Sequence, residues 1–385
     1  MTVKLGDIAF ENRENWTGST EGVPIVGLEH LTPGEIKLQD WTSDLKESTF
    51  TKKFRKGQVL LGRRRVYLRK AALAPFDGIC SGDITVIESD PAKLLPELLP
   101  FIIQNDEFFD YAMKGSAGSL SPRVKWAYLA NYTFNLPSLL EQRRQADLLW
   151  AANDLKESYK RLLAVSDEMA KSRFDEMFGD GFLEQNKHRI VKLKDISIKI
   201  SDGVHAKPEY TASGKPFLSV VNIVKGFVDF TDCKFVSEVA YRKMISSTHP
   251  EKGDVLYTKV GATYGVPAYV DTDQDFCLYV SVCLIKPNHQ KVDSRFLAFS
   301  MKMPYVKHQA DTRIKGIGVP DLHLNQIREF DIILPPMEQQ REFVAFIEQL
   351  DKSKVALQKG ITALDDTIKT ILHKTFFNEE EKNNV

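Results

Sequence analysis

The sequence contains a long internal repeat, and this repeat limits the folds that the chain can adopt. Residues 334–341 (LPPMEQQR) match residues 136–143 (LPSLLEQR) at an offset of 198 positions. Each copy follows a short apolar run that is typical of a strand, at 132–135 and at 330–333, and each copy leads into a helical pattern. A sequence that repeats itself at this distance predicts two similar structural halves.

Two long helices are predicted to follow the two copies of this motif. The apolar pattern after Arg341 steps by four and three residues, as does a less regular pattern after Arg143. Each helix should run for about 40 residues, or roughly 60 Å. Ser138 and Glu141 have the spacing of a capping box at the start of the first helix, whereas Gly360 interrupts the second at a cost of about 1 kcal/mol.

The apolar seams of the two helices are predicted to pack on each other as an antiparallel coiled-coil pair. The alternative is that each helix packs on its own globular domain. The residues predicted to form the helix-pair interface are Leu148, Leu155, Tyr159, Leu162, Met169, Ile347, Leu350, Leu357, Ile361, Leu364 and Ile368.

The repeat extends beyond the helices into the globular parts of the chain. Residues 4–8 recur at 192–196, residues 23–28 at 215–220, and residues 56–60 at 252–256, with offsets from 188 to 198. This order predicts a domain at 1–135, a helix at 136–180, a linker at 181–190, a second domain at 191–333, a second helix at 334–378 and a disordered acidic tail at 379–385.

The expected fold class is α+β, with two similar mixed α/β domains separated by the two helices. Strands are expected at 84–87 and 280–285, and helices at 94–114 and 294–310, which prolines must break or kink. An antiparallel helix pair would relate the two domains by a pseudo-twofold axis. Such an arrangement suits a long ligand with approximate twofold symmetry, and double-helical DNA is one.

Composition excludes several classes of protein. The 385 residues carry 52 Lys and Arg against 52 Asp and Glu, so the net charge does not indicate a nucleic-acid partner. Evidence for such a partner has to come from local clusters of basic residues. No apolar run reaches the ~18 residues of a membrane span, and no signal peptide is recognisable, so we expect a cytoplasmic protein without a membrane partner. The four cysteines are scattered, which predicts buried thiols rather than disulfides or a metal site.

Basic and polar residues in both halves are candidates for contact with DNA. The stretch 52–70 holds nine Lys and Arg and no acid, a pattern that suits a phosphate backbone and equally a solvated basic face. Arginines at a strand exit can also pair with guanine. The candidate DNA-binding residues are Arg63, Arg64, Arg65, Lys70, Arg123 and Lys125 in the first half, and His205, Lys207, Tyr210, Lys259, Thr263, Tyr264, Arg313 and Lys315 in the second.

No catalytic motif assembles from the sequence. It lacks a Walker motif, a metalloprotease or zinc-deaminase signature, a nucleophile elbow, and the Asn-Pro-Pro-Tyr-like run of amino-methyltransferases. A two-domain binding protein is therefore predicted. Two alternatives stay open, namely a coiled-coil adaptor of protein complexes without DNA recognition, and a DNA-modifying enzyme whose acids are dispersed in the sequence.

The sequence resembles the specificity (S) subunit of type I restriction-modification systems. The resemblance is carried by the two Leu-Pro-x-x-x-x-Gln-Arg helix starts at Leu136 and Leu334, by the helices behind them, and by residues 202–205 (DGVH), 252–256 (KGDVL) and 260–265 (VGATYG). It covers almost the whole chain and is closer in the second half. The first half has Leu61-Gly62-Arg63-Arg64-Arg65 where the second has the Gly-Ala-Thr-Tyr run.

This resemblance implies a non-catalytic subunit with two target-recognition domains, each reading one half of a split, asymmetric sequence in double-stranded DNA. The helices would act as a spacer that sets the gap between the halves. Two methyltransferase subunits would dock on the helices and flip an adenine out of the duplex for methylation, and translocating restriction subunits would join them. The chain itself would bind no cofactor, since S-adenosylmethionine, ATP and Mg²⁺ would belong to the partner subunits.

Overall fold

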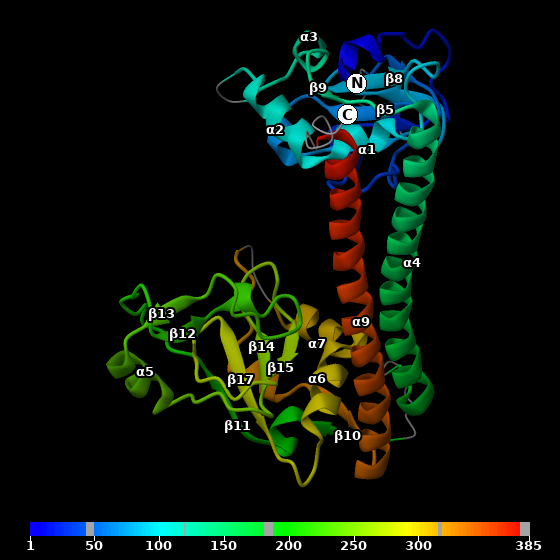
Figure 1. Cartoon of the computed structure of the whole chain (residues 1–385). Helices are drawn as coiled ribbons and strands as arrows, with labels where there is room; N and C mark the ends of the chain where they lie inside the picture. Colours follow the sequence, from blue (N-terminus) through cyan, green and yellow to red (C-terminus); the bar gives the residue numbers. More distant parts are fainter. Residues whose placement is uncertain (44–49, 119–120, 181–187, 315–317, 378–385) are drawn as a thin grey trace. The chain divides into compact units, whose positions relative to one another are not determined.

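The computed structural model describes residues 1–43, 50–118, 121–180, 188–314 and 318–377 (Figure 1). The chain divides into two compact units, which are Met1–Leu162 with Ala356–Val385, and Leu163–Val355. Two helices of 40 residues each, α4 (Leu139–Phe178) and α9 (Met337–Phe376), contribute one segment to each unit. The predicted tail at 379–385 and most of the predicted linker lie outside the described residues.

The globular part of the first unit, here called domain 1, is built on a four-stranded antiparallel sheet with the order β2-β8-β5-β6. Its strands are β2 (Ala9–Asn12), β8 (Ile84–Ser89), β5 (Val59–Gly62) and β6 (Ala71–Leu73). A smaller sheet consists of β3 (Ile25–Val26), β7 (Gly78–Cys80) and β4 (Lys52–Phe54). Strand β1 (Thr2–Lys4) pairs with β9 (Thr133–Asn135), so the two ends of the domain meet at the start of α4.

The globular part of the second unit, here called domain 2, repeats this topology. Its main sheet has the order β11 (Ser197–Asp202), β17 (Val282–Pro287), β14 (Val255–Thr258) and β15 (Pro267–Tyr269), and its smaller sheet has the order β13 (Lys234–Val236), β12 (Lys215–Leu218) and β16 (Cys277–Leu278). Strands β10 (Arg189–Lys192) and β18 (Asp331–Leu334) pair as β1 and β9 do. The predicted internal repeat is thus confirmed, although the small sheets differ in which strand is central.

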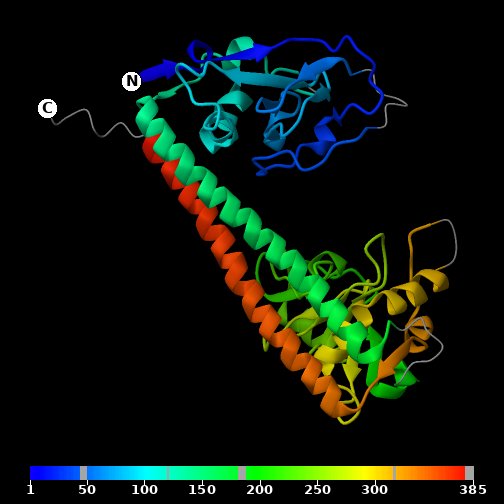
Figure 2. The same cartoon turned by 90° about the vertical axis from the view of Figure 1, so that its right-hand side faces the viewer.

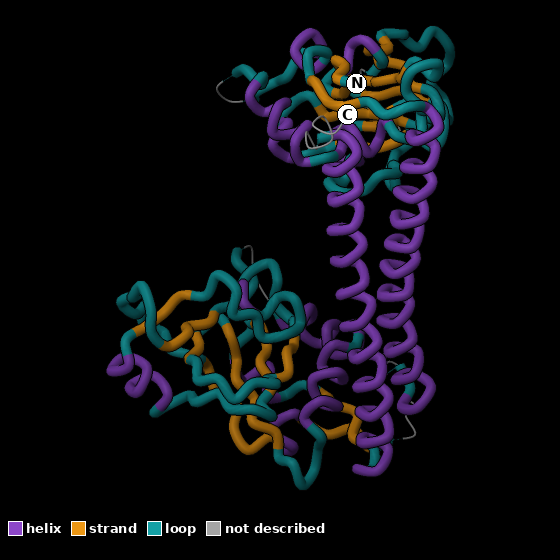
Figure 3. Tube along the Cα trace, in the orientation of Figure 1, coloured by secondary structure: helices purple, strands orange, loops and turns teal. Residues whose placement is uncertain are grey.

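Short helices cover the main sheet of each domain (Figure 3). They are α1 (Leu99–Gln104), α2 (Asp106–Lys114) and α3 (Trp126–Leu129) in domain 1, and α6 (Ser294–Lys302), α7 (Pro304–Arg313) and α8 (Leu324–Arg328) in domain 2, which also has α5 (Glu238–Ile245). The helices predicted at 94–114 and 294–310 are each split into two. Asn105 caps the second piece in domain 1, and Pro304 starts it in domain 2, where its missing N–H is no loss.

Each domain extends its hydrophobic core onto its segments of α4 and α9. In the first unit, Phe134 of β9 packs edge-on against Phe376 of α9, with 5.8 Å between the ring centroids. In the second unit, Phe174 of α4 packs against Phe343 of α9 at 5.5 Å, and both rings are fully buried. The helices therefore pack on the domains as well as on each other, so both predicted packing modes are present.

Within each unit, the segments of α4 and α9 lie side by side and run antiparallel (Figure 2). In the first unit, Lys156 Nζ lies 2.9 Å from Asp365 Oδ1, and Tyr159 packs on Gly360. A Cβ atom at Gly360 would come within 2.5 Å of the Tyr159 ring, which explains the glycine in the helix. In the second unit, Lys354 Nζ lies 2.7 Å from Asp167 Oδ1.

The predicted interface on α4 was wrong in register, except for Tyr159, which packs on Gly360 of α9. Leu148, Leu155, Leu162 and Met169 are between 44% and 50% exposed. The residue that follows each of them, namely Leu149, Lys156, Leu163 and Ala170, is buried or half-buried. A search for apolar spacing missed this face because it includes the buried polar residues Asn153, Lys156 and Ser166.

On α9, the buried face follows the apolar spacing. The residues Ile347, Leu350, Leu357, Ile361, Leu364 and Ile368 are all buried or half-buried. The same holds for Lys354, whose ammonium group is paired with Asp167. The difference between the two helices follows from the nearly unbroken apolar heptads of α9.

Candidate nucleic-acid interface

In domain 1, the arginines at the exit of β5 are fastened to the segment that precedes α3. The N–H of Val124 donates a hydrogen bond of 3.0 Å to the carbonyl of Arg63, and the N–H of Arg65 donates one of 2.8 Å to the carbonyl of Pro122. Arg64 and Arg123 form an antiparallel bridge between the two segments. Residues 63–65 and 122–124, which lie far apart in the sequence, therefore form one site.

Asp83 is the electrostatic centre of this site. Its carboxylate accepts hydrogen bonds from Arg123 Nε at 2.7 Å and from Arg64 Nη1 at 3.3 Å, while Arg64 Nη2 donates to Ser121 Oγ at 3.0 Å. These contacts, led by the hydrogen bond from Arg123, hold the pKa of Asp83 below its ordinary value. Two guanidinium groups share one carboxylate, which leaves the site cationic.

The remaining candidates of domain 1 differ in their availability. Arg65 and Lys125 are exposed, and their charged groups have no partner within the described part of the chain. The backbone of Arg65 has a φ of 53°, a left-handed conformation that is uncommon for residues other than glycine. In contrast, the ammonium group of Lys70 donates a hydrogen bond of 2.7 Å to the carbonyl of Leu28, which gives Lys70 a structural role.

Much of the basic stretch 52–70 is neutralised by acids from elsewhere in the chain. Lys52 pairs with Glu11, and Arg55 pairs with Glu14. Arg69 contacts both Asp106 and Asp110 of α2. The absence of acids from the stretch itself therefore does not produce an uninterrupted basic surface.

Domain 2 has a site with the same backbone frame. The N–H of Leu322 donates a hydrogen bond of 2.9 Å to the carbonyl of Lys259, and the N–H of Gly261 donates one of 2.9 Å to the carbonyl of Pro320. Val260 and Asp321 form the antiparallel bridge. Gly261 has a positive φ of 92°, as Arg65 does in domain 1. Residues 259–261 and 320–322 are therefore the structural counterparts of residues 63–65 and 122–124.

The side chains at this second site have the opposite charge pattern. Lys259 is buried between two carboxylates, with its Nζ 3.6 Å from Asp202 Oδ2 and 3.5 Å from Asp321 Oδ1. Burial raises the pKa of Asp202, although Lys259 and His205 act in the other direction. Since Lys259 is buried and its charge is paired, it does not face a ligand directly, contrary to our expectation.

His205, Lys207 and Tyr210 lie on the loop that follows β11. His205 is largely exposed, and its Nε2 lies 4.0 Å from Asp202 Oδ2. The ammonium groups of Lys207 and Lys234 lie 5.7 Å and 4.4 Å from the centroid of the Tyr210 ring. An aromatic ring flanked by cations suits stacking with a base and contact with a phosphate. Lys234 was not recognised in the sequence because it lies 24 residues away from Tyr210.

Thr263 and Tyr264 lie on the loop between β14 and β15. The carbonyl of Thr263 accepts a hydrogen bond from Thr258 Oγ1 at 2.8 Å. The hydroxyl of Tyr264 donates to Asp311 Oδ1 at 2.6 Å, and the ammonium group of Lys307 lies 4.0 Å from the Tyr264 ring centroid. These contacts hold the loop in place beside α7.

Arg313 has a structural role that the sequence did not reveal. Its guanidinium donates to the carbonyls of Gln309 at 2.8 Å and Glu329 at 3.2 Å. It also lies 5.2 Å from the centroid of the Phe330 ring. Arg313 therefore fastens α7 to the end of domain 2, and Lys315 lies outside the described residues.

Comparison with known proteins shows what the chain is similar to. Residues 186–364 match the family model described as the type I restriction modification DNA specificity domain. The crystal structure of a type I restriction-modification S subunit from M. genitalium covers 98% of this chain and 96% of its own, with a TM-score of 0.59 and 14% identity. The second half of the chain thus resembles this specificity domain, and the chain as a whole shares the fold of the M. genitalium S subunit.

Specificity subunits of type I restriction enzymes match the chain over most of their length. The MjaIX specificity subunit of Methanocaldococcus jannaschii is 24% identical over 353 residues, which are 85% of this chain and 78% of that protein. The EcoBI specificity subunit of Escherichia coli is 24% identical over 342 residues, which are 77% and 71% of the two chains. Each of these relatives is named as the specificity subunit of a type I restriction enzyme.

Grooves border the two equivalent sites of this chain. A groove of about 460 Å³ in domain 1 is lined by Arg13, Lys52 and Asp83. A groove of about 850 Å³ in domain 2 runs along β11 and is lined by Asp202 and His205. Both candidate sites therefore lie beside a concave surface.

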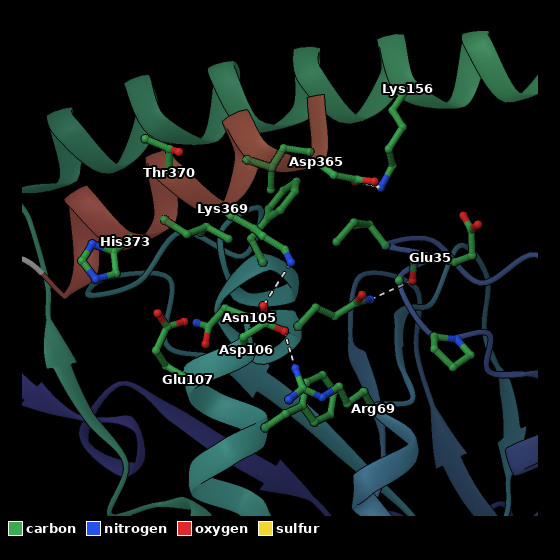
Figure 4. A pocket seen from close by; sticks show the side chains of 18 of the residues that line it. Glu35, Arg69, Asn105, Asp106, Glu107, Lys156, Asp365, Lys369, Thr370 and His373 are labelled. Atoms are coloured by element: carbon green, nitrogen blue, oxygen red, sulfur yellow. Dashed lines mark hydrogen bonds and ion pairs between the residues drawn. The ribbon is translucent and has the colours of Figure 1, made fainter. Parts of the chain in front are cut away.

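A further cavity of about 850 Å³ lies within the first unit, between domain 1 and its segments of α4 and α9 (Figure 4). Asp106 of α2 lies between Arg69 and Lys369, whose Nζ is 3.2 Å from Asp106 Oδ2. Lys160 of α4 pairs with Glu35 at 2.6 Å. Because these charges are paired with each other, the cavity is interpreted as part of the attachment of domain 1 to the helices.

Neither a metal-binding group nor a membrane-spanning helix was found in the part of the chain that the structure describes. No group of three or more His, Cys, Asp or Glu residues among the described residues is arranged to hold a metal ion. None of the described helices is long and apolar enough to cross a membrane. All four cysteines are free, and three of them are buried.

Proposed function

We propose that this chain is a type I restriction-modification specificity subunit. It reads a bipartite, asymmetric site in double-stranded DNA, one half with domain 1 and the other with domain 2. The observation that carries the proposal is the recurrence of one backbone frame, at 63–65 with 122–124 and at 259–261 with 320–322. The same frame holds Arg64 and Arg123 in one domain and Val260 and Asp321 in the other. Equivalent positions with different side chains support the reading of two different half-sequences.

The candidate residues that remain available for DNA contact are divided between the two domains. In domain 1 they are Arg64, Arg65, Arg123 and Lys125, and in domain 2 they are His205, Lys207 and Tyr210. The exposed cations suit phosphate contacts, which make binding sensitive to salt, while the arginines held by Asp83 suit a base edge. The two long helices act as the spacer that sets the gap between the half-sequences.

The partners of the proposed complex are two methyltransferase subunits, which dock on the helices, and translocating restriction subunits. Support comes from Leu148, Leu155 and Leu162, which recur every seven residues on α4 and are 44% to 50% exposed. An exposed apolar row on a helix suits packing against helices of another subunit. S-adenosylmethionine, ATP and Mg²⁺ are bound by these partners, and this chain is proposed to bind none of them.

The test is methylome sequencing of a host that expresses this chain with its cognate methyltransferase subunit, compared with the same host without the chain. The expected result is a methylated adenine in a two-part motif with a fixed gap, present only when the chain is present. If the complex assembles and the methyltransferase is active but no new motif appears, the DNA-reading function is rejected. The chain would then be an adaptor of protein complexes.

A further inference from the structure

Arg123 and Asp321 occupy the same position in the two domains. Each follows the proline whose carbonyl accepts the loop N–H, and each forms the antiparallel bridge to the strand-exit loop. Their side chains are exposed to a similar extent, 47% for Arg123 and 45% for Asp321. Two residues of opposite charge therefore project from one structural position, in a chain whose domains are proposed above to read DNA.

Each of these side chains is held in place by a group of opposite charge. Arg123 donates hydrogen bonds to the Asp83 carboxylate from Nε at 2.7 Å and from Nη2 at 3.3 Å, which leaves Nη1 free to donate to a ligand. Asp321 Oδ1 lies 3.5 Å from Lys259 Nζ, and Asp321 Oδ2 has no partner among the described residues. A guanidinium and a carboxylate are thus both oriented by a neighbouring charge, and each keeps hydrogen-bonding capacity for a ligand.

Buried polar atoms without partners lie beside both residues. Within the described ranges, Arg64 Nε in domain 1 and Asp202 Oδ1 in domain 2 are buried and make no hydrogen bond. Leaving such atoms unpaired lowers the stability of the free protein. The presence of such an atom at each of the two sites indicates that the sites are shaped by a requirement other than the stability of the free fold.

The chemistry of the two side chains indicates which groups they recognise. A guanidinium matches the O6 and N7 acceptors of guanine in the major groove, whereas a carboxylate accepts a hydrogen bond from the N4 amino group of cytosine. A carboxylate is repelled by the phosphate backbone, so Asp321 is unsuited to a phosphate contact.

We propose that Arg123 and Asp321 are equivalent specificity-determining residues, one in each domain, and that each reads a G·C base pair. Arg123 reads the pair from guanine, and Asp321 reads it from cytosine. This inference rests on the proposed function and adds to it one named position in each half-site. Asp321 is the less expected of the two, because acids are not anticipated at a DNA interface from sequence alone.

The experiment is methylome sequencing of hosts that express the complete methyltransferase complex with Arg123→Ala or with Asp321→Asn. Each variant should accept other base pairs at one position that the wild-type chain restricts to G·C. The two positions should lie in opposite halves of the motif. Discrimination at that position should fall about tenfold to a hundredfold, as expected for the loss of one good base contact.

A matched control is Asp331→Asn, which changes another half-exposed carboxylate of domain 2, paired with Lys192 rather than with Lys259. This variant should leave the motif unchanged. The thermal unfolding and the assembly of each complex are measured in parallel. Asp321→Asn has the same shape as the wild-type residue and is expected to keep both.

Several outcomes would overturn the inference. They are relaxation at an A·T pair, changes in both halves from one variant, an unchanged motif for both variants, and uniform loss of methylation at all sequences by an assembled complex. The failure of the proposed function is distinguishable, since in that case the wild-type chain itself would produce no motif.

Discussion

Gln142 and Gln340 make the same set of hydrogen bonds in the two units. Gln142 Nε2 donates to the carbonyls of Lys93 at 2.9 Å and Pro137 at 3.0 Å, and its Oε1 accepts from the N–H of Leu95 at 3.0 Å. In the same way, Gln340 Nε2 donates to the carbonyls of Lys291 and Pro335, and its Oε1 accepts from the N–H of Asp293. Both side chains are buried, so the glutamine of the repeated motif ties the start of each long helix to the loop that precedes α1 or α6.

Gln340→Ala should therefore destabilise the second unit. The change leaves buried backbone groups without partners, and the free energy of unfolding should fall by about 1 to 3 kcal/mol. Thermal and denaturant unfolding of the full chain would measure it. Gln339→Ala is the control, since Gln339 is only half-buried and should change stability by no more than about 0.5 kcal/mol. Equal effects of the two variants would argue against a stabilising role for the hydrogen bonds of Gln340.

Gly360→Ala should have effects of opposite sign in two backgrounds. In the wild-type chain, the new Cβ would lie 2.5 Å from the Tyr159 ring, so we expect a loss of about 1 kcal/mol despite the better helix propensity of alanine. In a Tyr159→Ala background, the same change should stabilise the chain by about 1 kcal/mol. A double-mutant cycle measured by denaturant unfolding tests this, and purely additive effects would contradict it.

The ion pairs of Asp83 should make the stability of domain 1 depend on pH. The pKa of Asp83 is lowered in the folded protein, so its contribution is present above the unfolded pKa of about 4 and is lost as the pH falls through the folded value. Asp83→Asn should cost about 1 kcal/mol or less at pH 7, because both arginines are more than a third exposed, and the difference from wild type should close in acid.

Unfolding measured between pH 7 and pH 3 would show this convergence. Asp40→Asn removes an exposed carboxylate that has no ion pair among the described residues, and it serves as the control. A difference between wild type and Asp83→Asn that stayed constant over this pH range would show that the ion pairs are not its source.

Leu155→Asp should weaken the binding of the methyltransferase subunits with little change in the stability of the free chain. Leu155 is 44% exposed, so the charge would remain in water in the free protein but would be buried in a helical interface. We expect a loss of affinity of at least about tenfold in a binding assay with the purified subunit. Val239→Asp on α5, where the side chain is 80% exposed, should have no such effect. Equal losses for both variants would rule out α4 as the docking surface.

Lengthening both long helices by one heptad should change the gap in the DNA motif and leave both half-sequences unchanged. Seven residues add about 10.5 Å to a helix, or roughly the length of three base pairs. The insertions would be placed where the chain passes from one compact unit to the other, after Leu162 and before Ala356. Methylome sequencing measures the gap, and altered half-sequences with an unaltered gap would contradict the role of the helices as a spacer.

The sequence was most informative where a pattern is repeated along one element. The apolar heptads of α9 identified its buried face, because nearly every buried position there is an apolar residue. The same procedure placed the face of α4 one residue too early. The buried positions on α4 include Asn153, Lys156 and Ser166, whose burial depends on partners such as Asp365 that lie about 200 residues away.

The sequence by itself determined the duplication, the two long helices, the strand-rich domains and the arginines at the exit of β5, because these depend on local periodicity and on internal similarity. Only the tertiary structure decided that Arg64 and Arg123 share Asp83, that Lys259 is buried between two acids, and that Asp321 is the counterpart of Arg123. The physical reason is that the charge of a site depends on which segments meet through backbone hydrogen bonds. Such long-range pairings leave no spacing in the sequence by which they can be recognised.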